Sequence, residues 1–132
     1  MTGTLGILSR AVSTTSIVTS SASLDTTLTI SAPVKLARRY RLRLLANWTL
    51  AVISDIWAFE VLRDGTVVTR IGVTPRYNNG FGVISSEMPF VPAADSTPSF
   101  VLRLTRISGS GALTLAGAAS TPTQFDLRDA GE

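Results

Sequence analysis

Three observations predict that this chain folds as an all-β protein, an antiparallel, jelly-roll-like β-sandwich of eight to ten short strands. Apolar and polar side chains alternate with a period of two in several segments, as in strands buried on one face. Gly, Pro, Asn and Asp separate these segments at the spacing of short strands. No segment repeats apolar residues at helical spacing between capping residues. We expect one domain over residues 1–132, because this length can bury a core without disulfides.

The N-terminal region is rich in Ser and Thr and contains the first predicted strands. Residues 6–12 form one short strand, on which Arg10 is exposed. Alternation at residues 27–30 predicts another, because β-branched side chains favour the pleated surface of a sheet, and Pro33 then interrupts the pattern. Residues 1–25 are polar and weakly patterned, so we expect them to include an arm that becomes ordered against a partner.

The clearest alternation, at residues 39–48, predicts the central strand of a sheet. Every second side chain is apolar and is expected to face the core, and these are Tyr40, Leu42, Leu44, Ala46 and Trp48. The side chains between them include a row of three arginines, Arg39, Arg41 and Arg43. A helix would mix arginine and leucine side chains on one face, so a strand explains the pattern better.

Residues 56–73 are predicted to form a β-hairpin, in which Asp64-Gly65 joins a strand at 56–63 to a return strand at 66–73. Asp-Gly supplies the positive φ angles that a two-residue hairpin turn demands. Alternation places one apolar set on each strand, and these are Trp57, Phe59 and Val61, then Val67, Ile71 and Val73.

The second half of the chain contains four more predicted strands and their loops. Composition marks a loop at residues 74–82 and another at the prolines between Pro89 and Pro98, where Phe90 is expected to reach the core. The strands are residues 81–88, 99–107, 112–116 and 125–128.

The composition limits the chemistry that this chain can perform. It has no Cys and no His, which excludes disulfides, thiolate or histidine metal sites and the common Ser-His-Asp and Cys-His nucleophile systems. We therefore expect no enzymatic activity and no cofactor. No apolar run approaches the ~20 residues of a membrane span and no signal peptide is recognisable, so we expect a soluble protein without a membrane partner.

The cationic side chains are almost all arginines. The net charge is +3, and Lys35 is the one lysine among twelve cations. The arginines are scattered and interleaved with Asp and Glu, whereas nucleic-acid binders cluster cations with aromatic residues between them. We therefore expect no nucleic-acid partner, and we favour ion pairs on a solvated or contacted face.

The first candidate binding group is the row formed by Arg39, Arg41 and Arg43. Guanidinium groups bind carboxylates through paired hydrogen bonds, so this row would suit an acidic partner or the carboxylates of a neighbouring subunit. The alternative is that the three arginines simply form a solvated face.

The second candidate is the loop that contains Tyr77, Asn78 and Asn79. Tyr and Asn offer stacking area and adaptable hydrogen bonds to a glycan or a protein. The alternative is a turn in which Asn79-Gly80 adopts left-handed backbone angles, and this simpler interpretation is favoured.

Other polar and aromatic residues have a structural explanation that is favoured over a functional one. A hydrolytic carboxylate pair needs a fixed separation, and the candidates are Asp55, Glu60 and Asp64. Asp64 is explained by its turn and Glu60 by an outward strand position. Trp48 and Trp57 can provide a stacking platform, but such residues more often fill a sandwich core.

Five stretches together form a combination typical of one group of proteins. They are the Ser/Thr-rich lead-in, residues 29–34, residues 39–42, residues 63–66 and the closing residues 125–131. In these stretches the chain resembles small β-rich virion proteins of tailed phages of actinobacteria, which are head-decoration, minor tail or fibre-tip proteins. The resemblance implies a virion protein that forms a homo-oligomer, with a trimer favoured, and it supplies no catalytic residues.

The leading hypothesis is therefore a non-enzymatic capsid decoration protein, assembled in the host cytoplasm and bound to the major capsid protein. A sandwich has open edge strands that invite pairing unless they are covered, which also favours a homo-oligomer. One alternative is a minor tail or fibre-tip protein that contacts tail proteins and binds a host-surface glycan through residues 77–81. Another is a hydrolase that uses Glu60 with Asp55.

Overall fold

The fold comes from a computed structural model that describes residues 6–75, 79–118, 120 and 122–131. These residues contain ten strands and no helix, so the predicted all-β class is confirmed and no described segment is a membrane-spanning helix. The strands are β1 (Ile7–Ser13), β2 (Ile17–Thr19), β3 (Ser23–Ser31), β4 (Arg39–Leu50), β5 (Ile56–Arg63), β6 (Thr66–Val73), β7 (Phe81–Phe90), β8 (Ser99–Ser108), β9 (Leu113–Ala116) and β10 (Thr123–Gly131).

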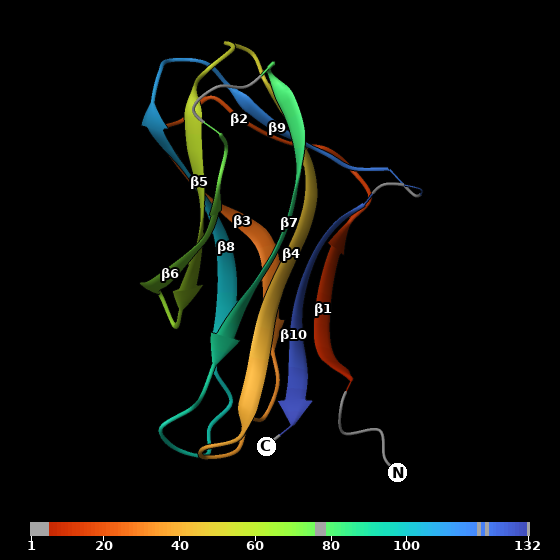
Figure 1. The fold of residues 1–132 in the computed structure, drawn as a ribbon, viewed down its shortest axis with the longest axis vertical. Helices are drawn as coiled ribbons and strands as arrows, with labels where there is room; N and C mark the ends of the chain where they lie inside the picture. Colours follow the sequence, from red (N-terminus) through yellow and green to blue (C-terminus); the bar gives the residue numbers. More distant parts are fainter. Residues whose placement is uncertain (1–5, 76–78, 119, 121, 132) are drawn as a thin grey trace.

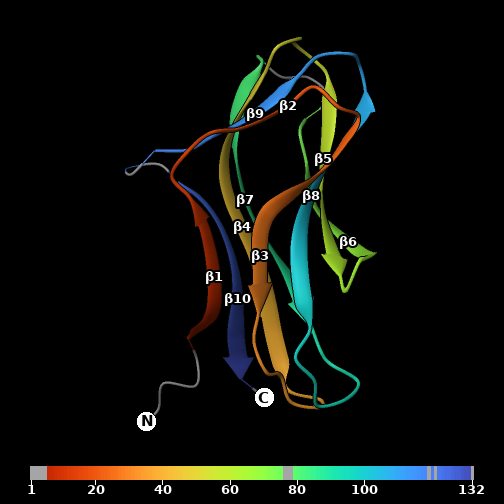
Figure 2. The same ribbon diagram turned by 180° about the vertical axis from the view of Figure 1, so that it is seen from behind.

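The strands form two antiparallel sheets that pack face to face, which confirms the predicted sandwich (Figures 1 and 2). Sheet A has six strands with β4 at its centre. β7 pairs with one side of β4, while β10 and β9 pair with successive parts of the other side. β1 and β2 extend the sheet beyond β10 and β9. Sheet B has four strands in the order β3-β8-β5-β6.

β4 is the central strand that the alternation predicts. Its apolar side chains, from Tyr40 to Trp48, are buried at every second position, and those between them are exposed or half-buried. Its 12 residues run along the long axis of the sandwich (Figure 1), from the lower end, where the C-terminus also lies, to the upper end. β4 therefore gives sheet A both its core face and its outer row of arginines.

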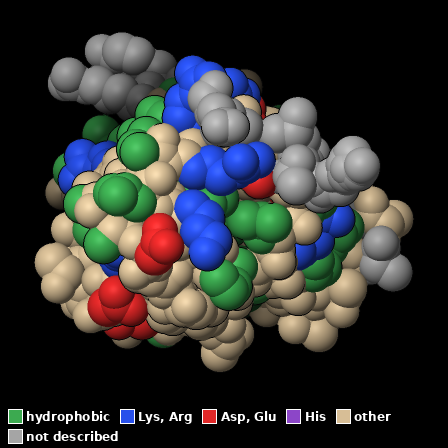
Figure 3. Space-filling view, turned by 90° about the horizontal axis from the view of Figure 1, so that it is seen from below, with side chains coloured by type: hydrophobic (Ala, Val, Ile, Leu, Met, Phe, Trp, Pro, Cys, Tyr) green, Lys and Arg blue, Asp and Glu red, His purple; other side chains and the backbone are tan. Residues whose placement is uncertain are grey.

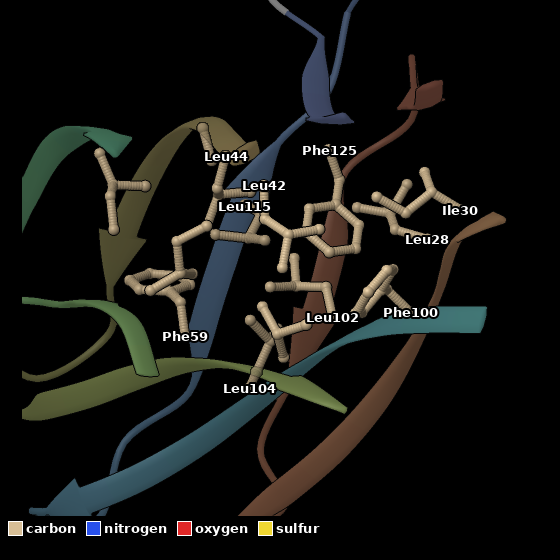
Figure 4. Close-up of a cluster of buried hydrophobic side chains, with 14 of the residues drawn as sticks. Leu28, Ile30, Leu42, Leu44, Phe59, Phe100, Leu102, Leu104, Leu115 and Phe125 are labelled. Atoms are coloured by element: carbon tan, nitrogen blue, oxygen red, sulfur yellow. The ribbon is translucent and has the colours of Figure 1, made fainter. Parts of the chain in front are cut away.

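The core lies between the two sheets (Figure 4). Leu42, Leu44 and Phe125 of sheet A point toward Phe59 and Leu102 of sheet B, and all five are buried. Burial of apolar surface at about 25 cal/mol per Å² is the dominant stabilising contribution in such a layer. Trp48 and Trp57 are also buried, at 3% and 0% exposure, so the prediction that both fill the core is confirmed.

Along its two sides, where edge strands of the two sheets face each other, the sandwich is held together by different contacts. On one side Gly72 of β6 lies under the side chain of Ile84 of β7, where a Cβ atom on residue 72 would overlap Ile84 Cδ1. On the other side the backbone N–H of Ser31 in β3 donates to Ser9 Oγ of β1 at 3.2 Å. These contacts hold sheet A over sheet B and leave the outer face of each sheet exposed.

The β5–β6 hairpin forms as predicted, since Asp64 and Gly65 adopt φ angles of 49° and 89°. The prediction that Val67, Ile71 and Val73 share one face of β6 is wrong. The pairing of β6 with β5 shifts register twice, and each shift inserts a residue that reverses the alternation. Ile71 is consequently buried, whereas Val67 and Val73 are both 43% exposed.

The two ends of the chain lie side by side in sheet A. β1 pairs with β10 from Ile7–Arg128 to Ser13–Thr123, so residues 7–13 are part of the sheet in the single chain. Residues 1–5 lie outside the described residues, and the partner-ordered arm stays a prediction. β10 is longer than the predicted strand at 125–128, because it is paired on both sides, with β1 and with β4.

Candidate docking surface

The predicted arginine row lies on the outer face of sheet A, near its lower end. Cross-strand register brings side chains from three other strands near this row: Arg41 is paired with Arg128 of β10 and Pro89 of β7, and Arg43 with Asp126 of β10 and Glu87 of β7. Arg10 of β1 is in turn paired with Asp126. We call this surface the arginine face and define it as Arg10, Arg39, Arg41, Arg43, Glu87, Asp126 and Arg128.

Asp126 is the buried anion at the centre of the arginine face. It is only 1% exposed although it points outward, because arginine side chains cover it. Arg10 Nε and Nη2 donate to its two carboxylate oxygens at 2.8 and 3.2 Å, and Arg128 Nη2 lies 3.6 Å from Oδ2. The hydrogen bond to Asp126 is the largest cause that raises the pKa of Arg10. This bidentate pair also ties β1 to β10.

Arg41, Arg43 and Arg128 are less well satisfied than Arg10. Arg41 Nη1 lies 3.6 Å from Glu87 Oε1, and both side chains are about half exposed. Among the residues that the structure describes, Arg43 forms no ion pair although it is flanked by Asp126 and Glu87. The buried Nε of Arg128 has no hydrogen-bond acceptor in the described part of the chain. The guanidinium groups of Arg41 and Arg43 therefore retain donors that an external carboxylate can use.

Two hollows adjoin at Arg41. One, of about 360 Å³, lies between the start of β4 and the end of β7 and is lined by Arg39, Tyr40, Arg41, Pro89, Val91 and Ala130. The other, of about 260 Å³, is lined by Arg41, Glu87, Arg128, Asp129 and Ala130. Both are open and shallow, so they suit side chains of a partner surface better than an enclosed small molecule.

The arginine face holds the charge excess of the chain. Its five arginines and two carboxylates leave three positive charges, the same as the net charge of twelve cations and nine anions in the whole sequence. Figure 3 looks at the lower end of the sandwich and shows Lys and Arg side chains at several places on it, some with Asp or Glu beside them. The surplus is thus concentrated on one surface.

The second predicted group lies away from the arginine face. Tyr77 and Asn78 lie outside the described residues, whereas Asn79 is exposed just before β7 at the upper end of the sandwich. Phe81, two residues after Asn79, is paired with Thr49, whereas Pro89 is paired with Arg41. Eight residues of β4, or about 26 Å, therefore separate the start of β7 from Arg41. The structure does not bring Asn79 together with Arg39, Arg41 and Arg43.

The carboxylates considered for hydrolysis are engaged within the fold. Asp55 is buried and accepts a hydrogen bond from the backbone N–H of Gly111 at 2.7 Å. Glu60 lies on the outer face of sheet B, where it accepts from Thr105 Oγ1 at 2.8 Å and lies 3.6 Å from Arg70 Nη2. Both contacts support the structural explanation of these side chains.

Sequence reasoning did not join Arg10, Asp126 and Arg128 to the arginine row. Alternation with buried Phe125 and Leu127 could have shown that Asp126 and Arg128 face outward. Nothing in the sequence specifies that β10 is inserted between β1 and β4. That placement joins residues 116 positions apart, such as Arg10 and Asp126.

Comparison with known proteins shows the fold. No family model and no curated protein matches the chain. Among solved structures it is similar to Eiger TNF from S. frugiperda, with a TM-score of 0.54 and 8% identity over 97% of this chain and 95% of that one. The likeness supports the jelly-roll sandwich and, at this identity, nothing beyond the fold.

Two further similar structures have lower scores. A family 35 carbohydrate binding module from Clostridium thermocellum has a TM-score of 0.42 and 9% identity, covering 88% of this chain and 96% of the module. A structure of infectious bursal disease virus, Gt strain, has a TM-score of 0.47 and 12% identity, covering 92% of this chain and 38% of the viral one.

Proposed function

We propose that this protein is a non-enzymatic structural component of a phage particle, a decoration protein that docks its arginine face on carboxylates of the major capsid protein. The observation that supports docking is the concentration of the chain's charge excess on one sheet face, where Arg43 forms no ion pair within the described residues. The phage setting rests on the family resemblance of the sequence. A trimer is the oligomer that this resemblance implies.

The composition of the arginine face suits contact with protein. Arginine is enriched in protein interfaces and lysine is depleted, because the planar guanidinium binds carboxylates bidentately and is more weakly hydrated. All five cations of this face are arginines. Asp126 holds two of them in place, so less side-chain entropy is lost when a partner carboxylate binds. The face is therefore organised before the partner arrives.

The test is binding of the purified chain to assembled capsids of the phage that encodes it, measured by co-sedimentation. The double variant Arg41→Gln/Arg43→Gln is expected to weaken binding more than tenfold. Arg70→Gln/Arg103→Gln removes the same charge from the outer face of sheet B and is expected to change binding less than twofold. Binding should also weaken as salt rises from 0.05 to about 0.5 M, because exposed charges are screened.

Equal losses in the two double variants, or no binding of the wild-type chain to capsids, would contradict the proposed function. Circular dichroism of each variant separates a loss of binding from a loss of folding. Mass measurement of the free and capsid-bound protein gives the number of copies.

A second candidate function is a minor tail or fibre-tip protein that binds a host-surface glycan. The observation that favours it is the exposed aromatic ring of Phe81, 66% accessible and two residues from the exposed amide of Asn79. An aromatic face beside an amide can stack on a sugar ring and donate hydrogen bonds to its hydroxyls. A glycan array probed with wild type, Asn79→Ala and Phe81→Ala tests it. If both variants still bind the glycans that wild type binds, this site is excluded.

A further inference from the structure

The edge strands of the sandwich differ in how well they are protected against pairing. Among the described residues, β1, β3 and β6 each contain at least one register irregularity, and β2 is only three residues long. β7 is different: its ten residues pair with β4 without any shift, from Phe90–Tyr40 to Phe81–Thr49. No described strand pairs with its other side. Bulges and short length blunt an edge, whereas a long regular edge invites another strand.

The lower half of β7 has its own protection, which the upper half lacks. Glu87 and Pro89 are a charged residue and a proline of the kind that discourage edge pairing, and both lie toward the lower end. Residues 81–86 contain no charged residue and no proline. The unprotected part of the edge is therefore its upper half.

The most exposed apolar side chains of the described residues are two of this upper half, Phe81 and Val83, and one of the loop between β4 and β5, Ile53. Phe81, Val83 and Ile53 are 66%, 63% and 63% exposed. Phe81 and Val83 point to the outer face, opposite Thr49 and Asn47 of β4. An exposed apolar surface along an open, regular strand indicates a site where another strand adds to the sheet.

We propose that the upper half of β7 pairs antiparallel with the same strand of a second copy, about a two-fold axis near Val83. In this register Val83 faces its own symmetry mate, and Phe81 faces Ser85 and is the diagonal neighbour of Val83 in the second copy. Glu87 then lies opposite Asn79 of the second copy, not opposite another carboxylate. Two six-stranded sheets join into one continuous sheet.

Charge also favours the upper half as the contact. Arg43 and Glu87 are paired with each other and lie four residues from the level of Val83, or about 13 Å from the axis along the strands. The two arginine faces are then about 26 Å apart, beyond the ~8 Å screening length of physiological salt. An axis near Glu87 would instead bring like charges of the two copies together. The pairing thus avoids repulsion and leaves both arginine faces uncovered.

This inference goes beyond capsid docking, because it uses a different surface and predicts a two-fold contact instead of the trimer implied by the resemblance. Sedimentation of the full chain from about 1 to 200 μM tests it. Wild type is expected to form dimers, and Val83→Lys is expected to raise the dimer dissociation constant more than tenfold, because two lysines would meet at the axis. Val68→Lys is the matched control, since Val68 is 51% exposed but lies on the bulged edge strand β6.

A wild-type chain that stays monomeric or forms trimers would overturn the proposal, as would dimers that persist equally in Val83→Lys. A second variant locates the axis. The chain has no Cys, so any disulfide formed by Val83→Cys joins two molecules. Mild oxidation should convert most of Val83→Cys, and little of Val68→Cys, to covalent dimer. Equal cross-linking of the two cysteine variants would place the contact elsewhere.

Discussion

The outer faces of the two sheets use charge in opposite ways. On sheet B, Asp25, Arg103, Glu60 and Arg70 are two anions and two cations that alternate across the strands. Arg103 donates to both carboxylate oxygens of Asp25, and Arg70 lies near Glu60. On sheet A five arginines share two carboxylates. A face that balances its own charge needs no partner, whereas a face with surplus guanidinium groups gains from one.

The largest effect on stability is expected for Asp126, the buried carboxylate of the arginine face. Asp126→Asn should lower the free energy of unfolding by about 2 to 3 kcal/mol, because Arg10 and Arg128 would lose the buried anion that holds them. The side chains of these arginines remain about one third exposed, which keeps the cost below that of a fully buried pair. Urea unfolding measures the change. A loss below 0.5 kcal/mol would show that Asp126 does not organise the face.

Single arginine substitutions on the two sheets should have smaller effects, and their order should differ between stability and capsid binding. Arg103→Gln on sheet B is expected to cost about 0.5 to 1 kcal/mol of stability, since it removes a bidentate partner of the exposed Asp25. Arg43→Gln on sheet A should change stability by less than about 0.5 kcal/mol, because Arg43 forms no ion pair within the described residues. Thermal unfolding compares the two, and capsid co-sedimentation should rank them in the reverse order. If the two variants have the same order in unfolding and in capsid binding, the proposed difference between the two faces is contradicted.

The smallest expected effect is the change in stability with pH that Asp25 contributes. The hydrogen bond from Arg103 is the first cause that holds the pKa of Asp25 below its ordinary value. A carboxyl group with a lowered folded-state pKa stabilises the fold above its unfolded pKa of about 3.9, and this stabilisation disappears as the pH falls through the folded pKa. Wild type should therefore be slightly more stable than Asp25→Asn at pH 7 and equal to it near pH 2. Unfolding at both pH values checks this, and a difference that persists near pH 2 would contradict it.

Most of the strands could be predicted because their signals are local. The alternation from Tyr40 to Trp48 and the Asp64-Gly65 turn depend on side chains a few residues apart, and both appear in the structure. The face assignment within β6 failed because its two bulges are defined only by pairing with β5. The extension of β10 to Gly131 was missed for a similar reason, since neighbouring strands on both sides hold residues that show little pattern of their own.

The candidate site could be predicted only in part. Arg39, Arg41 and Arg43 share a face because they alternate within one strand. Arg10, Asp126 and Glu87 join them through the order and register of four strands. The same is true of the open edge of β7, since the sequence of residues 81–86 marks a strand but not whether anything lies beside it.

In regular strands such as β4, the sequence alone determined which side chains point in and which point out, because an unbulged strand alternates whatever its neighbours are. Only the tertiary structure decided which outward side chains meet and which edge is left unpaired. Strand order depends on how the whole core packs, and a one-residue change of register moves every side chain to the other face. The surplus of arginine on one face and the exposed edge of β7 therefore belong to the fold and not to any one segment.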